Sequence, residues 1–349
     1  MKGGRNLADT TITSEQFKEK FDEVKAELSK VFIGHDVAVT NMLISIYSRG
    51  HVLLSGMPGL GRSLLVQTIA KILGLDFNRL QFTPDLLPTD ITGAELLVGD
   101  GKNEERRFEF FKGPVFANIV LADEINRSPA RTQSALLEVM QEKQVTMGGQ
   151  RYKLPNPFLL IATQNSLDTE GVWPLGEAQA DRFMFSIEQG YPHYEEERKI
   201  ILATTGTLNP SVSAISNPAE VIAMQDIASN VPIVPSVKEF ALRLVRASRP
   251  GEEGVSDEIN KIIKLGAGPR ASQALLTTSK VKALSCGRSY VCKQDIIDVA
   301  EPVMAHRLQL DFRAKADGKD YKYVLGELFK SAQEKDRPQV NMWAKELLK

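Results

Sequence analysis

The sequence has little of several features that would assign it to a specialised class of protein. It has two cysteines, Cys286 and Cys292, in 349 residues. Two thiols are too few for a disulfide framework, and their spacing matches no zinc motif. No apolar run approaches the length that crosses a bilayer, and the N-terminus lacks an apolar signal segment. We therefore expect a cytoplasmic protein with reduced thiols and no membrane insertion.

An excess of charge of either sign is also missing. The formal net charge is -1, with 25% charged and 42% hydrophobic residues, which is ordinary for a globular chain. A balanced charge gives no bulk attraction to nucleic acid, so no nucleic-acid partner is expected. A chain of this length is more than a single small core requires, and two domains are the natural expectation.

The most informative segment that is present is a glycine loop at residues 56–63, Gly-Met-Pro-Gly-Leu-Gly-Arg-Ser. It follows the phosphate-binding pattern G-x-x-x-x-G-K-[ST], whose backbone N–H groups cradle phosphates and whose hydroxyl binds Mg²⁺. The lysine position holds Arg62, and the hydroxyl is that of Ser63. The predicted nucleotide-binding residues of the loop are Gly56, Met57, Pro58, Gly59, Leu60, Gly61, Arg62, Ser63 and Leu64.

The surroundings of the loop predict an α/β fold. A short apolar run at 52–54 leads into the loop, and a helical pattern follows it. Further apolar runs at 115–122 and 158–162 read as buried strands, and each is followed by polar residues. Strands that alternate with helices predict a parallel sheet covered on both sides, and ligands bind at the carboxyl ends of such strands.

Two hairpins and a helical second half complete the predicted organisation. Alternating patterns at 95–111 and 144–154 surround the dipeptides Asp100-Gly101 and Gly148-Gly149, which are strong hairpin signals. Beyond residue 190 the pattern is mostly helical as far as residue 310.

Two acidic residues, Asp123 and Glu124, follow the second predicted strand. The first can hold Mg²⁺, and the second can polarise the water that attacks a γ-phosphate. Acidic pairs also occur simply at helix N-termini, but the upstream glycine loop favours the functional interpretation. Thr163 and Asn165 follow the third strand, where a polar side chain can orient water, although asparagine is also a common turn residue.

Two arginines in the second half of the chain are candidates for contact with phosphate. Arg182 can stabilise transition-state charge as a finger supplied in trans. Arg270 follows Pro269 at the start of a predicted helix, from which it can reach nucleotide bound on the other domain. A surface ion pair is the ordinary alternative for both.

Together these segments resemble the MoxR-type AAA+ ATPases over roughly residues 14–330. The resemblance is carried by residues 31–34, 51–61, 81–88, 113–118, 121–127, 133–138, 162–165, 177–183 and 268–271. It implies an AAA+ P-loop core with a parallel sheet, followed by an α-helical lid, and a homo-oligomeric ring, usually a hexamer, with ATP between neighbours. The two hairpins would be the insertions of this family.

The resemblance also implies roles for single residues. Asp123 would be the Walker B aspartate, which with Ser63 holds Mg²⁺, and Glu124 the catalytic glutamate. Asn165 would be sensor 1, Arg182 the arginine finger and Arg270 sensor 2. Ile33 and Gly34 would line the adenine side, and Arg127 would face the neighbouring subunit. Members of the family act as chaperone-like activators, often of proteins with a von Willebrand factor A domain.

The expected domain limits follow from the same reading. Residues 1–12 are expected to be a flexible tail, 13–190 the nucleotide-binding core, 191–310 the lid and 311–349 a C-terminal extension.

Two positions depart from the family pattern. Arg62 replaces the loop lysine, and because arginine is longer and planar we expect slowed hydrolysis more than lost binding. Ser166 stands where the family usually has proline. Three alternatives remain open: an ATP-assembled ring that acts as a binding module with little hydrolysis, a chelatase-type motor subunit, and a nucleic-acid translocase, which the near-neutral charge disfavours.

Overall fold

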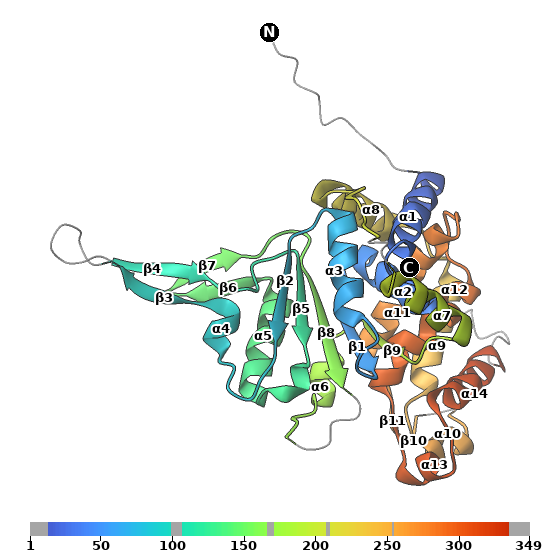
Figure 1. The fold of residues 1–349 in the computed structure, drawn as a ribbon. Helices are drawn as coiled ribbons and strands as arrows, with labels where there is room; N and C mark the ends of the chain where they lie inside the picture. Colours follow the sequence, from blue (N-terminus) through green and yellow to red (C-terminus); the bar gives the residue numbers. More distant parts are fainter. Residues whose placement is uncertain (1–12, 99–106, 166–170, 207–209, 253–254, 335–349) are drawn as a thin grey trace, which may run out of the picture.

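A computed structural model of the chain describes residues 13–98, 107–165, 171–206, 210–252 and 255–334 (Figure 1). The expected tail at 1–12, the turn at Asp100-Gly101, Ser166 and the last residues of the expected C-terminal extension lie outside these ranges.

A five-stranded parallel sheet forms the centre of the fold, in the order β2-β5-β8-β1-β9. The strands are β1 (Val52–Gly56), β2 (Phe77–Gln81), β5 (Ile119–Asp123), β8 (Leu159–Asn165) and β9 (Phe185–Gln189). Alternate residues of each inner strand enter two different hydrophobic clusters: Leu54 and Leu121 lie in one, Leu53 and Val120 in the other. The sheet is therefore covered on both faces, and the predicted α/β class is confirmed.

Helices cover the two faces unequally. On one face lie α1 (Ser14–Ser29), α2 (Asp36–Tyr47) and α3 (Arg62–Leu73), whose buried side chains share a single cluster with the helices of the C-terminal half. On the other face lie α4 (Pro88–Thr92) and α5 (Ala130–Glu142) with a smaller cluster. The first cluster is continuous from the sheet into the C-terminal helices, so these two parts of the chain share a core.

Both predicted hairpins are present. The first pairs β3 (Gly93–Val98) with β4 (Arg107–Lys112), and the second pairs β6 (Gln144–Met147) with β7 (Gln150–Lys153). The rings of Phe110 and Tyr152 lie 4.3 Å apart between centroids, which joins the two hairpins. They extend together from the side of the core opposite the C-terminal helices (Figure 1).

One predicted strand is shorter than expected. The apolar run at 115–122 becomes a strand only from Ile119 onward. Val115 donates its N–H to the carbonyl of Ile91 and Ala117 donates to Val115, so these donors do not join the ladder. Pro114 just before them has no N–H to offer. The prediction of a strand over residues 115–118 is therefore wrong.

The C-terminal half is helical, with one small two-stranded sheet. The elements are α6 (Glu177–Ala180), α7 (Tyr194–Thr204), α8 (Pro218–Asn230), α9 (Pro235–Ala247), α10 (Asp257–Ile262), β10 (Ile263–Leu265), α11 (Pro269–Ser285), α12 (Lys293–Met304), the 3₁₀ helix η2 (Ala305–Arg307), β11 (Gln309–Leu310), α13 (Phe312–Ala316) and α14 (Tyr321–Glu334). Beyond residue 310, α14 packs against α9 and α12. None of the helices in the described ranges is long and apolar enough to cross a membrane.

His51, just before β1, gives the fold a dependence on pH. Its Nδ1 accepts the N–H of Leu160 at 2.9 Å, which requires an unprotonated nitrogen. Burial, with a smaller effect of Lys143, lowers the pKa of His51 to about 3. Because the unfolded chain binds this proton near its ordinary pKa of about 6.5, the stabilisation is complete above that pH and is lost as the pH falls toward 3.

We predict that the free energy of unfolding falls between pH 6.5 and 4, by up to about 1.4 kcal/mol per pH unit for this one group. The amide oxygen of His51→Asn can still accept from Leu160. In this variant the dependence of the unfolding free energy on pH should correspond to about one proton fewer taken up on unfolding. Urea unfolding at a series of pH values measures both slopes. Equal slopes in the two proteins would contradict the assignment.

Candidate nucleotide site

The glycine loop joins the end of β1 to the start of α3. Gly56 has φ of 135° and Gly61 has φ of 71°, values that residues with a Cβ rarely adopt. A Cβ on Gly56 would also lie 2.1 Å from the carbonyl oxygen of Gln189. Glycine is therefore required there for space as well as for conformation, and the loop ends at the N-terminus of a helix, where backbone N–H groups favour anions.

Two neighbours fix the position of the loop. Gln189, at the end of β9, donates its Nε2 hydrogen to the carbonyl of Leu60 at 3.0 Å. The ring of Phe32 lies 3.4 Å from the point where a Cβ on Gly61 would stand. The next two residues, Ile33 and Gly34, do not line the cavity at the loop, and a Cβ on Gly34 would lie 2.8 Å from Cδ of Glu196.

Asp123, the last residue of β5, is held by three side chains. Thr163 on β8 donates its hydroxyl to Oδ1 at 2.6 Å, and Ser63 of the loop lies with its Oγ 3.4 Å from Oδ2. Arg79 on β2 donates from Nε to Oδ2 at 3.0 Å. The carboxylate is thus oriented toward the hydroxyl of the loop.

Glu124 follows with a left-handed backbone, φ 58°. Its N–H donates to the hydroxyl of Thr163 at 2.8 Å, and its Oε2 accepts from Nε2 of Gln81 at 2.9 Å. Nε of Arg127 lies 3.2 Å from the same oxygen. Since Nη2 of Arg79 also donates to Oε1 of Gln81 at 2.7 Å, a chain of contacts runs from Asp123 through Arg79 and Gln81 to Glu124. We call this chain the β2 relay.

A cavity of about 250 Å³ brings most of the predicted residues together. It is lined by Pro58, Gly59, Leu60, Gly61, Arg62, Ser63, Leu64, Asp123, Glu124, Thr163 and Asn165. The hydroxyl of Ser63 and the carboxylate of Asp123 are oxygen ligands of the kind that Mg²⁺ prefers, and the loop offers N–H groups for phosphate. The residues present therefore fit a magnesium-bound phosphate group.

Arg62, the first residue of α3, points along the loop. Its Nη1 donates to the carbonyl of Gln164 at 3.0 Å and its Nη2 donates to the carbonyl of Met57. Burial lowers the pKa of this guanidinium, while the carboxylates of Asp123 and Glu124 oppose that shift. Two of its donors are thus used on backbone carbonyls of the loop and of β8.

Arg182 and Arg270 do not line this cavity. They lie instead on either side of Asp181: Nη1 of Arg270 is 3.2 Å from Oδ2 of Asp181, and Arg182 is the next residue of the chain. Nε of Arg182 is buried and has no hydrogen-bond partner in the described part of the chain. Arg270 is therefore a contact of Asp181 and Arg182 its neighbour in the chain, and neither lines the cavity at the loop.

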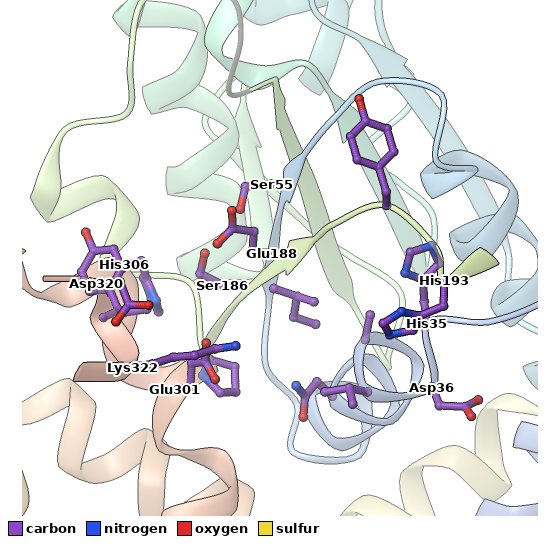
Figure 2. Close-up of a pocket in the computed structure, with 18 of the residues that line it drawn as sticks. His35, Asp36, Ser55, Ser186, Glu188, His193, Glu301, His306, Asp320 and Lys322 are labelled. Carbon is purple, nitrogen blue, oxygen red and sulfur yellow. The ribbon is translucent and has the colours of Figure 1, made fainter. Parts of the chain in front are cut away.

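A second hollow, of about 660 Å³, lies at the free edge of β9. One wall comes from the start of α2 with His35, and the opposite wall comes from α12, η2 and α14 (Figure 2). Figure 2 shows His35 and His193 on one side of the hollow and Glu301, His306, Asp320 and Lys322 on the other. Burial, with the nearby His193, lowers the pKa of His35, and Glu196 opposes the shift.

Three residues of the site were not among the predicted ones: Arg79, Gln81 and Gln189. All lie on β2 and β9, the two edge strands of the sheet. Gln81 belongs to residues 81–88, which carry the family resemblance, so the sequence could have indicated it as a site residue. No pattern pointed to Arg79 or Gln189, because their partners lie 44 and 129 residues away in the chain.

The strand order, the phosphate loop after β1 and the helical C-terminal half define the AAA+ class of P-loop ATPases. Residues 51–185 match the family described as "ATPase family associated with various cellular activities (AAA)". Residues 256–325 match the AAA lid domain. The α/β core and the helical lid are thus found in the sequence comparison and in the fold.

The whole chain has similar relatives. It is 42% identical over 315 residues to "Chaperone MoxR1" of Mycobacterium tuberculosis, covering 90% of this chain and 81% of that protein. It is 28% identical over 296 residues to "Protein MoxR" of Methylorubrum extorquens, covering 82% and 86%. The structure of a putative ATPase from Cytophaga hutchinsonii aligns with TM-score 0.83 and 41% identity, over 91% of this chain and 96% of that one. The chain belongs to the MoxR family of AAA+ ATPases.

We predict that Arg79→Gln strengthens the binding of Mg²⁺ to the nucleotide-loaded protein. A metal held by Asp123 would compete with the guanidinium of Arg79, which donates to Oδ2 of that carboxylate. An exposed pair of this kind is worth about 1 kcal/mol or less, so the half-saturating Mg²⁺ concentration should fall about threefold to fivefold. Titration of Mg²⁺ into the complex with a fluorescent ADP measures this.

Arg107→Gln is the matched control, because Arg107 pairs with Glu109 on the distant hairpin. An unchanged Mg²⁺ midpoint in Arg79→Gln would show that the two cations do not compete.

Proposed function

We propose that this chain hydrolyses ATP and uses the cycle to remodel or activate a partner protein. The observation that carries the proposal is the single cavity lined by the phosphate loop, Asp123, Glu124 and Asn165. ATP hydrolysis on such a site depends mainly on positioning and on charge.

Each group in the cavity receives a role in this proposal. The loop N–H groups hold the phosphates, and Ser63 with Asp123 holds Mg²⁺, which would supply positive charge to the phosphate oxygens. Glu124 polarises the attacking water, and Asn165 orients it. The β2 relay keeps both carboxylates ordered before the metal is bound.

The base of the nucleotide is assigned to the hollow beside the loop. Ile33 and Gly34 precede His35, which lines that hollow together with Tyr191 and His193. Its opposite wall belongs to the lid, with α12 and η2, and to α14 of the C-terminal extension. A nucleotide with its phosphates in the loop would thus contact core and lid together, which supports a lid that responds to nucleotide.

The proposed assembly is a ring, which we take to be hexameric, in the cytoplasm. Arg182 and Arg270 do not line the cavity at the loop of their own chain. We assign Arg182 to the nucleotide of a neighbouring copy, and Arg270, in the lid, to the role of sensor 2. An arginine offered in trans is a known device of phosphoryl transfer. For the domain organisation of each copy we propose a nucleotide-binding core at 13–190, a lid at 191–310 and a C-terminal extension from 311.

The partner is proposed to be a protein with a von Willebrand factor A domain, as the family resemblance implies. The name of the relative "Chaperone MoxR1" is in keeping with a chaperone-like role. The second candidate function, a ring that binds ATP for assembly and hydrolyses little, is favoured by one observation: donors of Arg62 are used on carbonyls of the protein.

We predict that Glu124→Gln lowers ATP hydrolysis at least a hundredfold, because the group that polarises water is lost. ATP binding should stay within a few-fold of wild type, since the loop is untouched. Steady-state phosphate release and fluorescent-nucleotide binding measure the two quantities. If the variant still supports partner activation, the ring acts as a binding module and the remodelling proposal is wrong.

We predict that Arg62→Lys raises the turnover number about tenfold or more, on the scale of one electrostatic contact restored in the transition state. A lysine is shorter and presents a compact charge to the phosphates. Rates at saturating ATP for the wild type, Arg62→Lys and Arg62→Ala provide the comparison. A lysine variant no faster than the wild type would mean that Arg62 is not what limits turnover.

A further inference from the structure

Arg307, in the 3₁₀ helix η2 that follows α12 of the lid, is buried against residues of the core. Its side chain is 3% exposed. Nε donates to Oδ1 of Asp181 at 2.8 Å, and Nη2 donates to the carbonyls of Asp181 at 3.1 Å and Phe183 at 2.6 Å. Nη1 donates to the carbonyl of Met184 at 3.2 Å and to that of Val303. A guanidinium has five donors, and these contacts match that number.

Four of these five contacts are to residues 181–184, the short segment that contains Arg182. The lid holds the segment at further points: Nε2 of His306 is 3.1 Å from the carbonyl oxygen of Phe183, and Arg270 pairs with the same carboxylate of Asp181. Phe183 itself is fully buried. The residues on both sides of Arg182 are thus fixed, and most of the fixing groups come from the lid.

The same 3₁₀ helix also touches the hollow at the edge of β9. Ala305 and His306 line that hollow (Figure 2), and Arg307, the next residue, holds the segment around Arg182. A shift of η2 caused by a ligand in the hollow would therefore move the main anchor of that segment.

We propose that Arg307 is a positioning residue that sets the direction of Arg182, so that the lid of one subunit controls the arginine which that subunit offers to its neighbour. The inference rests on the proposed function, in which Arg182 acts in trans. It adds that Arg307 contributes to hydrolysis in the adjacent subunit and not in its own.

Mixed rings separate an effect on the neighbour from an effect within the subunit. In Arg307→Gln the loop and Glu124 are intact but Arg182 is misplaced, whereas in Glu124→Gln the subunit cannot hydrolyse but keeps a well-placed Arg182. We expect Arg307→Gln rings to bind fluorescent ATP within about threefold of wild type and to hydrolyse it at least tenfold more slowly, as for the loss of a transition-state contact.

Mixing the two inactive proteins in equal amounts should restore hydrolysis to about a quarter of the wild-type rate in a ring with one repeated head-to-tail interface. Half of the subunits can hydrolyse, and half of those follow a neighbour with a well-placed arginine. A mixture no more active than the sum of its parts overturns the proposal, and so does an Arg307→Gln ring with wild-type activity.

Arg182→Ala mixed with Glu124→Gln tests the underlying function separately. Recovery in that mixture together with none for Arg307→Gln refutes only the role of Arg307. Failure of both mixtures refutes Arg182 as a finger in trans.

Two further variants guard against a simple folding defect. Asp181→Asn weakens the pair between Arg307 and Asp181 through the carboxylate, which is 28% exposed. If Arg307→Gln does not fold, Asp181→Asn should show the same recovery of hydrolysis on mixing with Glu124→Gln. Arg288→Gln is the structural control, because it breaks an arginine pair with Asp295 that lies wholly within the lid. It should lower the melting temperature without creating a defect that Glu124→Gln subunits can rescue.

Discussion

The parallel hydrogen bonding of β5, β8 and β1 is the constraint on which the candidate site depends. Ala162 on β8 is in register with Ala122 on one side and with Leu53 on the other, and Gly56 is in register with Asn165. Because the strands run in one direction, their carboxyl ends meet at one edge. Three segments that lie far apart in the chain, the loop, the acidic pair and the polar end of β8, therefore face the same cavity. The edge strands then add the groups that hold two of these segments, the loop and the acidic pair, in place.

The charged side chains of this site are held in position by neighbouring side chains and backbone carbonyls. The carboxylates of Asp123 and Glu124 are held through the β2 relay, and Arg62 is turned toward carbonyl oxygens. An ion pair such as that of Arg79 and Asp123 orders the carboxylate, but it also occupies an oxygen that a metal ion would need. The carboxylates and Arg62 are thus ordered by contacts within the protein itself, and a metal held by Asp123 would have to compete with Arg79 for that carboxylate.

The helical lid belongs to the same physical unit as the core. One hydrophobic cluster continues from the sheet into the lid, and the buried Arg307 fastens the lid to the segment that carries Arg182. A buried guanidinium is tolerated only when its donors are satisfied. Asp181 and the carbonyls around Arg182 provide those partners. The position of a candidate catalytic side chain is therefore tied to a domain that contributes nothing to the phosphate loop itself.

Sequence patterns predicted the elements whose signals are local. The inner strands β1, β5 and β8 are apolar runs followed by polar residues, and the hairpins carry glycine turns. The edge strands β2 and β9 were not predicted, because they are covered less evenly and mix polar with apolar residues. Residues 115–118 were assigned to a strand on apolar content alone, although their N–H groups bond elsewhere.

The sequence by itself determined the class of protein, the phosphate loop, the acidic pair and the unusual Arg62, because each is a short pattern with its own chemistry. Only the tertiary structure decided which groups contact each of them. In the structure Arg79 donates to Asp123, and Arg62 donates to backbone carbonyls. Arg182 and Arg270 do not line the cavity at the loop of their own chain. These contacts join residues as much as 102 positions apart. They depend on strand order and on the packing of the lid, which no local pattern encodes.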